Sequence, residues 1–398
     1  MLNIEEQTNY RISFHHLGFR PFFLLGGLFA VVSVCIWFLQ YHFNMLMPRI
    51  NNLPVAFWHA HEMIFGYGMA IIAGFLLTAV RNWTNVMTLH GWPLLVLALL
   101  WLLARMVPFS GSSHAMSMLL LFDISFNVLL CLAILHPIVK VRQWSQLGIW
   151  LKLLLLSLAN LLFYFGLLGQ VQGGMAMGLY AGLYLIISLI LLMGRRVIPF
   201  FIEKGVEEQV TLYNYQWLDV TSIVLVVVFI VLQVFTPWHI WAAALSSTLF
   251  LLHGLRMIGW HTPGIWQKPL LWILYLAYAC ITLGFGLTAL ANLGFVNPML
   301  ATHAFGYGGV GLMTLGMMAR VSLGHTGRSV FEPPTILRWM FLLAILGLFC
   351  RIVLPTLLPA NYGLWIGLSQ LLWIAAFAVF SWLYIPMLVQ PRVDGRYG

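Results

Sequence analysis

The sequence has 398 residues, of which 62% are hydrophobic and 7% are charged. Soluble domains carry about 25% charged residues, so the composition excludes an ordinary soluble protein and indicates an integral membrane protein. The net charge of +9 is compatible with a nucleic-acid-binding protein, but the basic residues gather between apolar segments and therefore report membrane orientation instead.

Twelve apolar segments are long enough to cross a bilayer as helices, which takes roughly 20 residues each. The first is too long for a signal peptide and lacks a small-residue cleavage site after it. We therefore predict an all-α, polytopic membrane protein with about 12 transmembrane helices in one integral membrane domain, residues 1–398. The predicted spans are 21–41, 57–80, 92–107, 115–139, 146–169, 173–193, 217–235, 238–260, 269–293, 298–320, 335–358 and 362–389.

The longest polar interruption, residues 194–216, is predicted to be a cytoplasmic linker. It separates six spans in 21–193 from six in 217–389, a 6+6 arrangement. Many transporters share this layout. A secondary transporter for a metal complex or small metabolite is therefore the alternative function.

Basic residues divide unevenly between the two sides of the predicted topology. With a cytoplasmic N-terminus, 16 of the 19 Lys and Arg residues, Arg11 among them, fall on the cytoplasmic side, and only Arg49, Arg105 and Arg351 fall outside. This bias follows the positive-inside rule. It predicts cytoplasmic N- and C-termini and removes the reason to expect a nucleic-acid partner.

Trp58-His59-Ala60-His61-Glu62-Met63 places several metal-capable side chains at the start of the second span. Helical residues two apart point about 200° apart, so His59 and His61 face different directions, whereas Met63 shares a face with His59. Two arrangements are compatible with these directions: two metal centres that flank the span, or a single metal centre in which the second imidazole has a supporting role. His303 enters the tenth span at nearly the depth of His61, which predicts an outer metal site from His59, His61, His303 and Met63.

A second candidate site lies on the cytoplasmic side. His253 and His325 accompany Arg320 and Arg328 there, and Arg pairs well with carboxylates and phosphates, so these residues compete as a haem-binding site. The cysteines show no CxxC or CxxCH spacing, which leaves only non-covalent haem. Asp123 has no partner evident in the sequence and fits either structural hydrogen bonding or a proton path.

Phe65-Gly66-Tyr67-Gly68 in the second span is echoed by Phe305-Gly306-Tyr307-Gly308 in the tenth, each shortly after a histidine. The two spans do not occupy equivalent places in the halves, so the echo gives little support for duplication and suggests shared local physics. No phosphate-binding loop, nucleophile elbow or HExxH motif occurs, so hydrolase and NTPase functions have no support.

Several motifs together resemble the NnrS family over nearly the whole chain. They are Gly18-Phe-Arg-Pro-Phe-Phe23, Trp58-His-Ala-His-Glu-Met63, Ala73-Gly-Phe-Leu-Leu-Thr-Ala-Val80 with Asn82-Trp-Thr84, Arg196-Val-Ile-Pro199, His303-Ala304 and Arg320-Val-Ser-Leu-Gly-His-Thr-Gly-Arg328.

The resemblance implies a multi-pass protein of the bacterial inner membrane that contains non-covalent haem and copper. It implies a role in nitric oxide metabolism and protection against nitrosative stress, with nitric oxide or a derived small molecule as partner in addition to the lipid bilayer. The family's histidines match His59, His61, His253, His303 and His325, without showing which metal each binds. Catalytic residues, redox activity toward nitric oxide and protein partners stay open.

Overall fold

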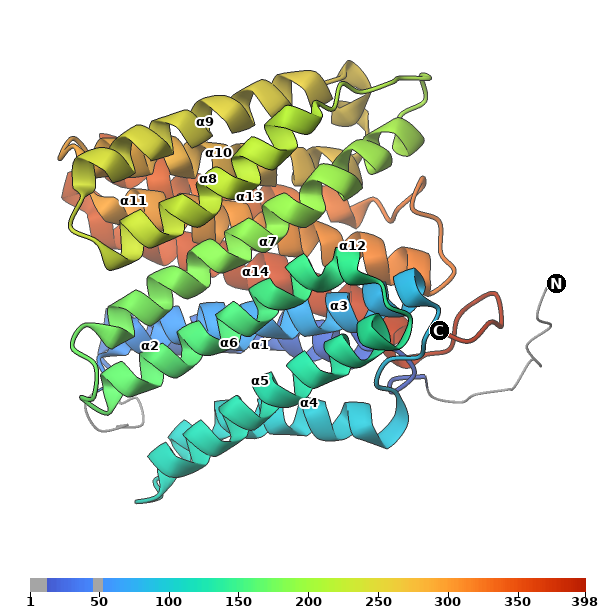
Figure 1. The fold of residues 1–398 in the computed structure, drawn as a ribbon, viewed down its shortest axis with the longest axis horizontal. Helices are drawn as coiled ribbons and strands as arrows, with labels where there is room; N and C mark the ends of the chain where they lie inside the picture. The colour runs from blue at the N-terminus through green and yellow to red at the C-terminus, as the bar shows by residue number, and fades with distance from the viewer. Residues whose placement is uncertain (1–12, 46–52) are drawn as a thin grey trace. The chain divides into compact units, whose positions relative to one another are not determined.

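The computed structural model describes residues 13–45 and 53–398, so Arg11 and Arg49 of the charge analysis lie outside the described residues. All regular secondary structure in these residues is helical (Figure 1). The helices are α1 (Phe19–Phe43), α2 (Val55–His61), η1 (Glu62–Gly68), α3 (Met69–Thr84), α4 (Gly91–Met106), α5 (Ala115–Lys140), α6 (Leu147–Leu167), α7 (Gly174–Gly205), α8 (Gln216–Phe235), α9 (His239–Trp260), α10 (Pro269–Asn292), α11 (Pro298–His303), η5 (Ala304–Leu312), α12 (Met313–His325), α13 (Ile336–Leu357) and α14 (Tyr362–Val389), with short 3-10 turns between some of them.

Within the described residues, 11 helices are long and apolar enough to cross a membrane. The predicted span 298–320 is not among them; there α11, η5 and α12 follow one another without a break. The all-α polytopic fold is therefore confirmed. One boundary differs from expectation: α7 continues through Pro199 to Gly205, so the first half of the predicted linker is helical.

The chain forms two compact units. Unit 1 contains Met1–Leu179, Met318–Val330 and Phe377–Gly398, and unit 2 contains Tyr180–Met317 and Phe331–Ala376. In unit 1, α4 packs against α5 and α1 against α3 (Figure 1). In unit 2, α10 packs against α9, α11, η5 and α13.

Two segments of π-helix, η1 and η5, interrupt the α-helical hydrogen bonding. Each begins directly after a histidine, His61 or His303, and each contains the Phe-Gly-Tyr-Gly sequence. The sequence echo therefore corresponds to a shared backbone conformation. A π-helical turn is rare and is frequently found at functional sites, which directs attention to the residues around both segments.

Candidate functional site

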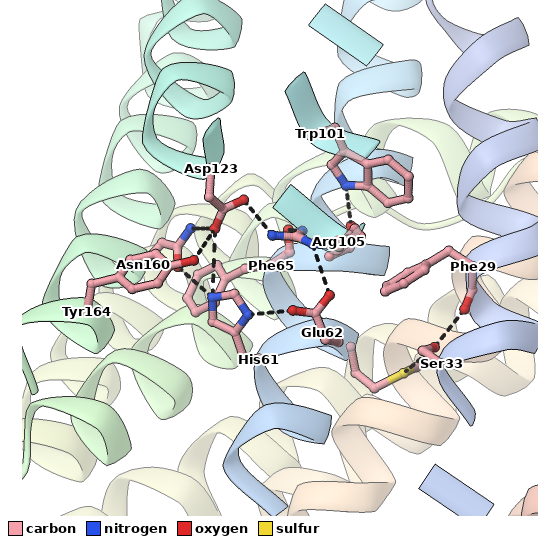
Figure 2. Close-up of polar contacts among 12 residues, drawn as sticks. Phe29, Ser33, His61, Glu62, Phe65, Trp101, Arg105, Asp123, Asn160 and Tyr164 are labelled. Atoms are coloured by element: carbon pink, nitrogen blue, oxygen red, sulfur yellow. Dashed lines mark hydrogen bonds and ion pairs between the residues drawn. The ribbon is translucent and has the colours of Figure 1, made fainter. Parts of the chain in front are cut away.

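Unit 1 buries a charged network around Arg105, which we call the Arg105 network: His61, Glu62, Arg105, Asp123, Asn160 and Tyr164 (Figure 2). Arg105 on α4 binds two carboxylates. Its Nη2 lies 2.7 Å from Asp123 Oδ1 on α5, and its Nε lies 3.0 Å from Glu62 Oε2 on η1. A buried charge is tolerated when it is paired and hydrogen-bonded, and here one guanidinium serves both acids.

Asp123 on α5 is fully buried. Its hydrogen-bond partners are Arg105 on α4 and Asn160 and Tyr164 on α6. Its Oδ2 accepts hydrogen bonds from Asn160 Nδ2 at 2.7 Å and from the Tyr164 hydroxyl at 2.9 Å. No sequence motif marks these partners, and the charge distribution alone places Arg105 on the outer side as a basic residue. The feature of the sequence that points to the pairing is depth in the membrane. Arg105 lies near the end of one span and Asp123 early in the next, so both lie at a similar level on adjacent antiparallel helices.

His61 uses both ring nitrogens within the Arg105 network. Nε2 lies 3.0 Å from Asn160 Oδ1, and Nδ1 lies 3.0 Å from Glu62 Oε1. Because the Asn160 amide nitrogen donates to Asp123, the Asn160 oxygen accepts a hydrogen bond from the Nε2–H of His61; this tautomer is inferred from the network.

The side chains of Glu62, Asp123 and Arg105 give the network two acidic groups and one basic group. The Nδ1–Oε1 contact places the His61 imidazole directly beside the Glu62 carboxyl group. The arrangement therefore brings three kinds of ionisable side chain together inside the membrane-spanning part of unit 1.

The π-helical turn of η1 supplies backbone acceptors to the same site. Arg105 Nη1 donates to the Phe65 carbonyl at 3.1 Å, and Trp101, one turn away on α4, donates to the Gly66 carbonyl at 2.9 Å. Gly66 must lack a side chain, because a Cβ there would lie 2.8 Å from Glu62 Oε2 and 2.8 Å from Phe29.

His59 and Met63 face α1, on a different side from His61. The His59 ring is stacked on Trp37, with centroids 4.8 Å apart and planes 5° apart. Met63 Sδ lies 3.8 Å from the Ser33 hydroxyl, and Ser33 and Trp37 are one turn apart on α1. The divergence of the two imidazoles that helical geometry predicted is thus present.

His303 is engaged within unit 2. Its Nδ1 donates to the Met299 carbonyl at 2.8 Å, and its Nε2 accepts from Arg351 Nη2 at 2.9 Å. Of the arginines assigned to the outer side by sequence, Arg105 is buried in the Arg105 network, whereas Arg351 is partly exposed and bonded to His303. His61 and His303 belong to different units, and a metal site shared between them stays a prediction.

His253 on α9 lies in unit 2 with no exposed surface. Its Nδ1 is 2.7 Å from the Tyr278 hydroxyl, and its ring is stacked on Phe285 at 5.5 Å. Arg256 binds the same hydroxyl at 3.0 Å and is held in turn by Asp219 at 2.9 Å. The other ring nitrogen, Nε2, is buried without a hydrogen-bond partner among the residues that the structure describes.

His325, Arg320 and Arg328 lie in unit 1, apart from the unit that contains His253. His325 ends α12, with its ring 5.5 Å from that of Phe19. Burial, together with Arg392, Arg81 and Arg20, lowers the pKa of His325 to about 4, so the imidazole is neutral near pH 7.

Among the described residues, no three side chains of His, Cys, Asp or Glu come together as a metal-binding group. The fold and the buried ion pairs define a polytopic helical membrane protein with ionisable side chains inside its spans. The chain belongs to the NnrS family, since the family model described as NnrS protein matches residues 13–392. No curated protein matches this chain.

Proposed function

We propose that this protein is a haem- and copper-containing protein of the bacterial inner membrane that protects cells against nitrosative stress. Membership of the NnrS family, which is associated with the nitric oxide response, supports this proposal. The partner would be nitric oxide or a small molecule derived from it.

The buried, unpartnered Nε2 of His253 is the observation that supports haem best. Imidazole is a common axial ligand of haem iron, and ligating histidines usually bond a second partner through their other nitrogen. Tyr278 supplies that bond, and Phe285 fixes the ring plane. When bound, haem would supply an iron centre able to take nitric oxide, while burial keeps water from the imidazole.

His59 and Met63 suit copper by their chemistry. Imidazole and thioether are ligands of reduced copper, and both side chains face α1 next to Trp37 and Ser33. His61 and His303 fit less well in the conformation described here, because each has both ring nitrogens in hydrogen bonds. Either would have to release a partner before binding a metal.

Haem content of purified variants tests the role of His253. We expect His253→Ala to insert normally but to lose haem, measured by extraction relative to protein. His239→Ala is the matched control, because His239 begins the same helix and is exposed. Equal haem in both variants would remove His253 as the ligand.

The copper content of purified variants tests the roles of His59 and Met63. We expect Met63→Leu, a volume-conserving change, to lower bound copper, and Met118→Leu, at an exposed position on α5, to leave it unchanged. Unaltered copper in both Met63→Leu and His59→Ala would exclude this pair.

A secondary transporter is the second candidate, and the Arg105 network is the observation that favours it. Ionisable residues inside membrane spans often mark substrate or proton paths. A well-folded preparation without haem or copper would favour this class over the first.

A further inference from the structure

Unit 1 gathers arginines near the ends of α12 and α14 with little opposing charge. Arg20, Arg81, Arg328 and Arg392 contribute four guanidinium groups, and among the described residues of unit 1 Asp394 is the one acidic side chain outside the Arg105 network. Arg392 occupies that carboxylate with two bonds of 2.8 Å and 2.6 Å. No ion pair with the other three arginines is found in the described part of the chain.

Arg20 has no exposed surface. Its Nε donates to the Gly398 backbone oxygen at 2.8 Å, and its Nη1 donates to the carbonyls of Leu388 and Gln390 at 2.9 Å and 2.7 Å. The Leu388 and Gln390 carbonyls, at the end of α14 and just after it, carry only partial negative charge. Within the described residues the Nη2 atom is buried without a hydrogen-bond partner, so one side of the guanidinium is unmatched.

The neighbouring side chains add positive charge and a second unmatched donor. Arg328 and Arg392 lie within electrostatic range of Arg20. Arg328 Nη1 is also buried with no hydrogen-bond partner in residues 13–45 and 53–398. Unpaired buried charges are costly, and like charges in one place increase that cost.

We propose that this cluster, which we call the Arg20 cluster, is a binding site for a phosphate oxyanion, with Arg20 and Arg328 as the principal ligands. Guanidinium groups bind the oxygens of phosphate with paired, charge-assisted hydrogen bonds. Arg81 lies beside the cluster, with its guanidinium 5.6 Å from the Tyr397 ring. The phosphate belongs either to an anionic lipid headgroup or to a dissolved ion. The proposal is independent of haem binding.

Thermal unfolding of the full-length protein in neutral detergent tests the site. One series adds inorganic phosphate against chloride at equal ionic strength, and the other adds phosphatidylglycerol against phosphatidylcholine. We expect a rise in the unfolding midpoint with phosphate, with phosphatidylglycerol, or with both. A rise with phosphatidylglycerol alone identifies the lipid as the source, and a rise with inorganic phosphate identifies the dissolved ion.

Arg328→Gln is the decisive variant, because Arg328 is only partly buried and its loss leaves the α14 contacts of Arg20 intact. We expect the apparent affinity to fall about tenfold or more, as loss of a charge-assisted bond implies. Arg338→Gln, at an exposed position on α13, should behave as wild type.

The proposal would be overturned if neither series shifted the unfolding midpoint, or if wild type and Arg328→Gln showed equal shifts. It would also be overturned if Arg328→Gln lost haem while phosphate left the midpoint of the wild type unchanged. The last outcome would assign these arginines to the haem carboxylates.

Discussion

Arg105 shows how one side chain makes a charged interior tolerable. It pairs with both Glu62 and Asp123, at distances of 3.0 Å and 2.7 Å, while also binding a π-helical carbonyl. The site therefore depends on a single cation. Removing it would leave two acids buried in a medium that disfavours their charged forms.

The first prediction follows from that dependence. Arg105→Met should destabilise the folded protein by about 3–5 kcal/mol, the cost of breaking a buried ion pair. Thermal unfolding in detergent should show a markedly lower midpoint or loss of folded protein. Arg338→Met, at an exposed position, is the control, and matching midpoints for the two variants would contradict the network's structural role.

His16 provides a prediction about pH. Burial, aided by His15, Arg20 and His90, lowers the pKa of His16 from 6.5 to about 4, and its ring is stacked on Tyr397 at 4.5 Å. Between these pKa values the unfolded chain binds the proton and the folded chain does not, so stability is complete above pH 6.5 and declines as the pH falls toward 4.

The measurement compares midpoints at pH 7 and pH 5 for wild type and His16→Gln. The acid-induced loss should be smaller in the variant. An identical loss in both proteins would show that His16 does not contribute.

At the residue scale, the sequence identifies unusual individual residues more readily than the residues that contact them. Asp123 stands out in the sequence as an unusual intramembrane acid, but no local pattern links it to Arg105 on α4 or to Asn160 and Tyr164 on α6, because helix packing brings these residues together. The opposing directions of His59 and His61 were predictable, since helical periodicity alone fixes them.

Among the elements, the π-helical segments were the least predictable. Sequence comparison found the repeated Phe-Gly-Tyr-Gly, but a π turn depends on what receives the displaced carbonyls, and for η1 those donors are Trp101 and Arg105 on another helix. Helix ends were easier, because hydropathy and turn residues mark them: α14 occupies the predicted 362–389.

The two π segments offer a matched pair of glycine substitutions. Gly66→Ala should destabilise the protein by about 1–3 kcal/mol, the usual cost of overpacking, because its Cβ would press on Glu62 and Phe29. Gly306→Ala should be tolerated, since a Cβ there meets nothing within 4 Å. Unfolding midpoints compare them, and equal destabilisation would mean that the π turn itself requires glycine.

At the scale of the whole molecule, the positive-inside distribution predicts the orientation. The segment between α7 and α8 and the C-terminus should both be cytoplasmic. Alkaline phosphatase fused after Glu208 or at the C-terminus should therefore be inactive, whereas a fluorescent protein at either place should fluoresce. Phosphatase activity from either fusion would reverse or break the proposed topology.

The proposed function requires that this membrane protein carry haem able to bind nitric oxide. The sharpest test is an anaerobic absorption spectrum of the purified, reduced, full-length protein before and after addition of nitric oxide. We expect a Soret band with iron near one equivalent per chain, and a shift of that band when nitric oxide is added. A folded protein without a Soret band, or a band that nitric oxide leaves unchanged, would contradict the proposed function.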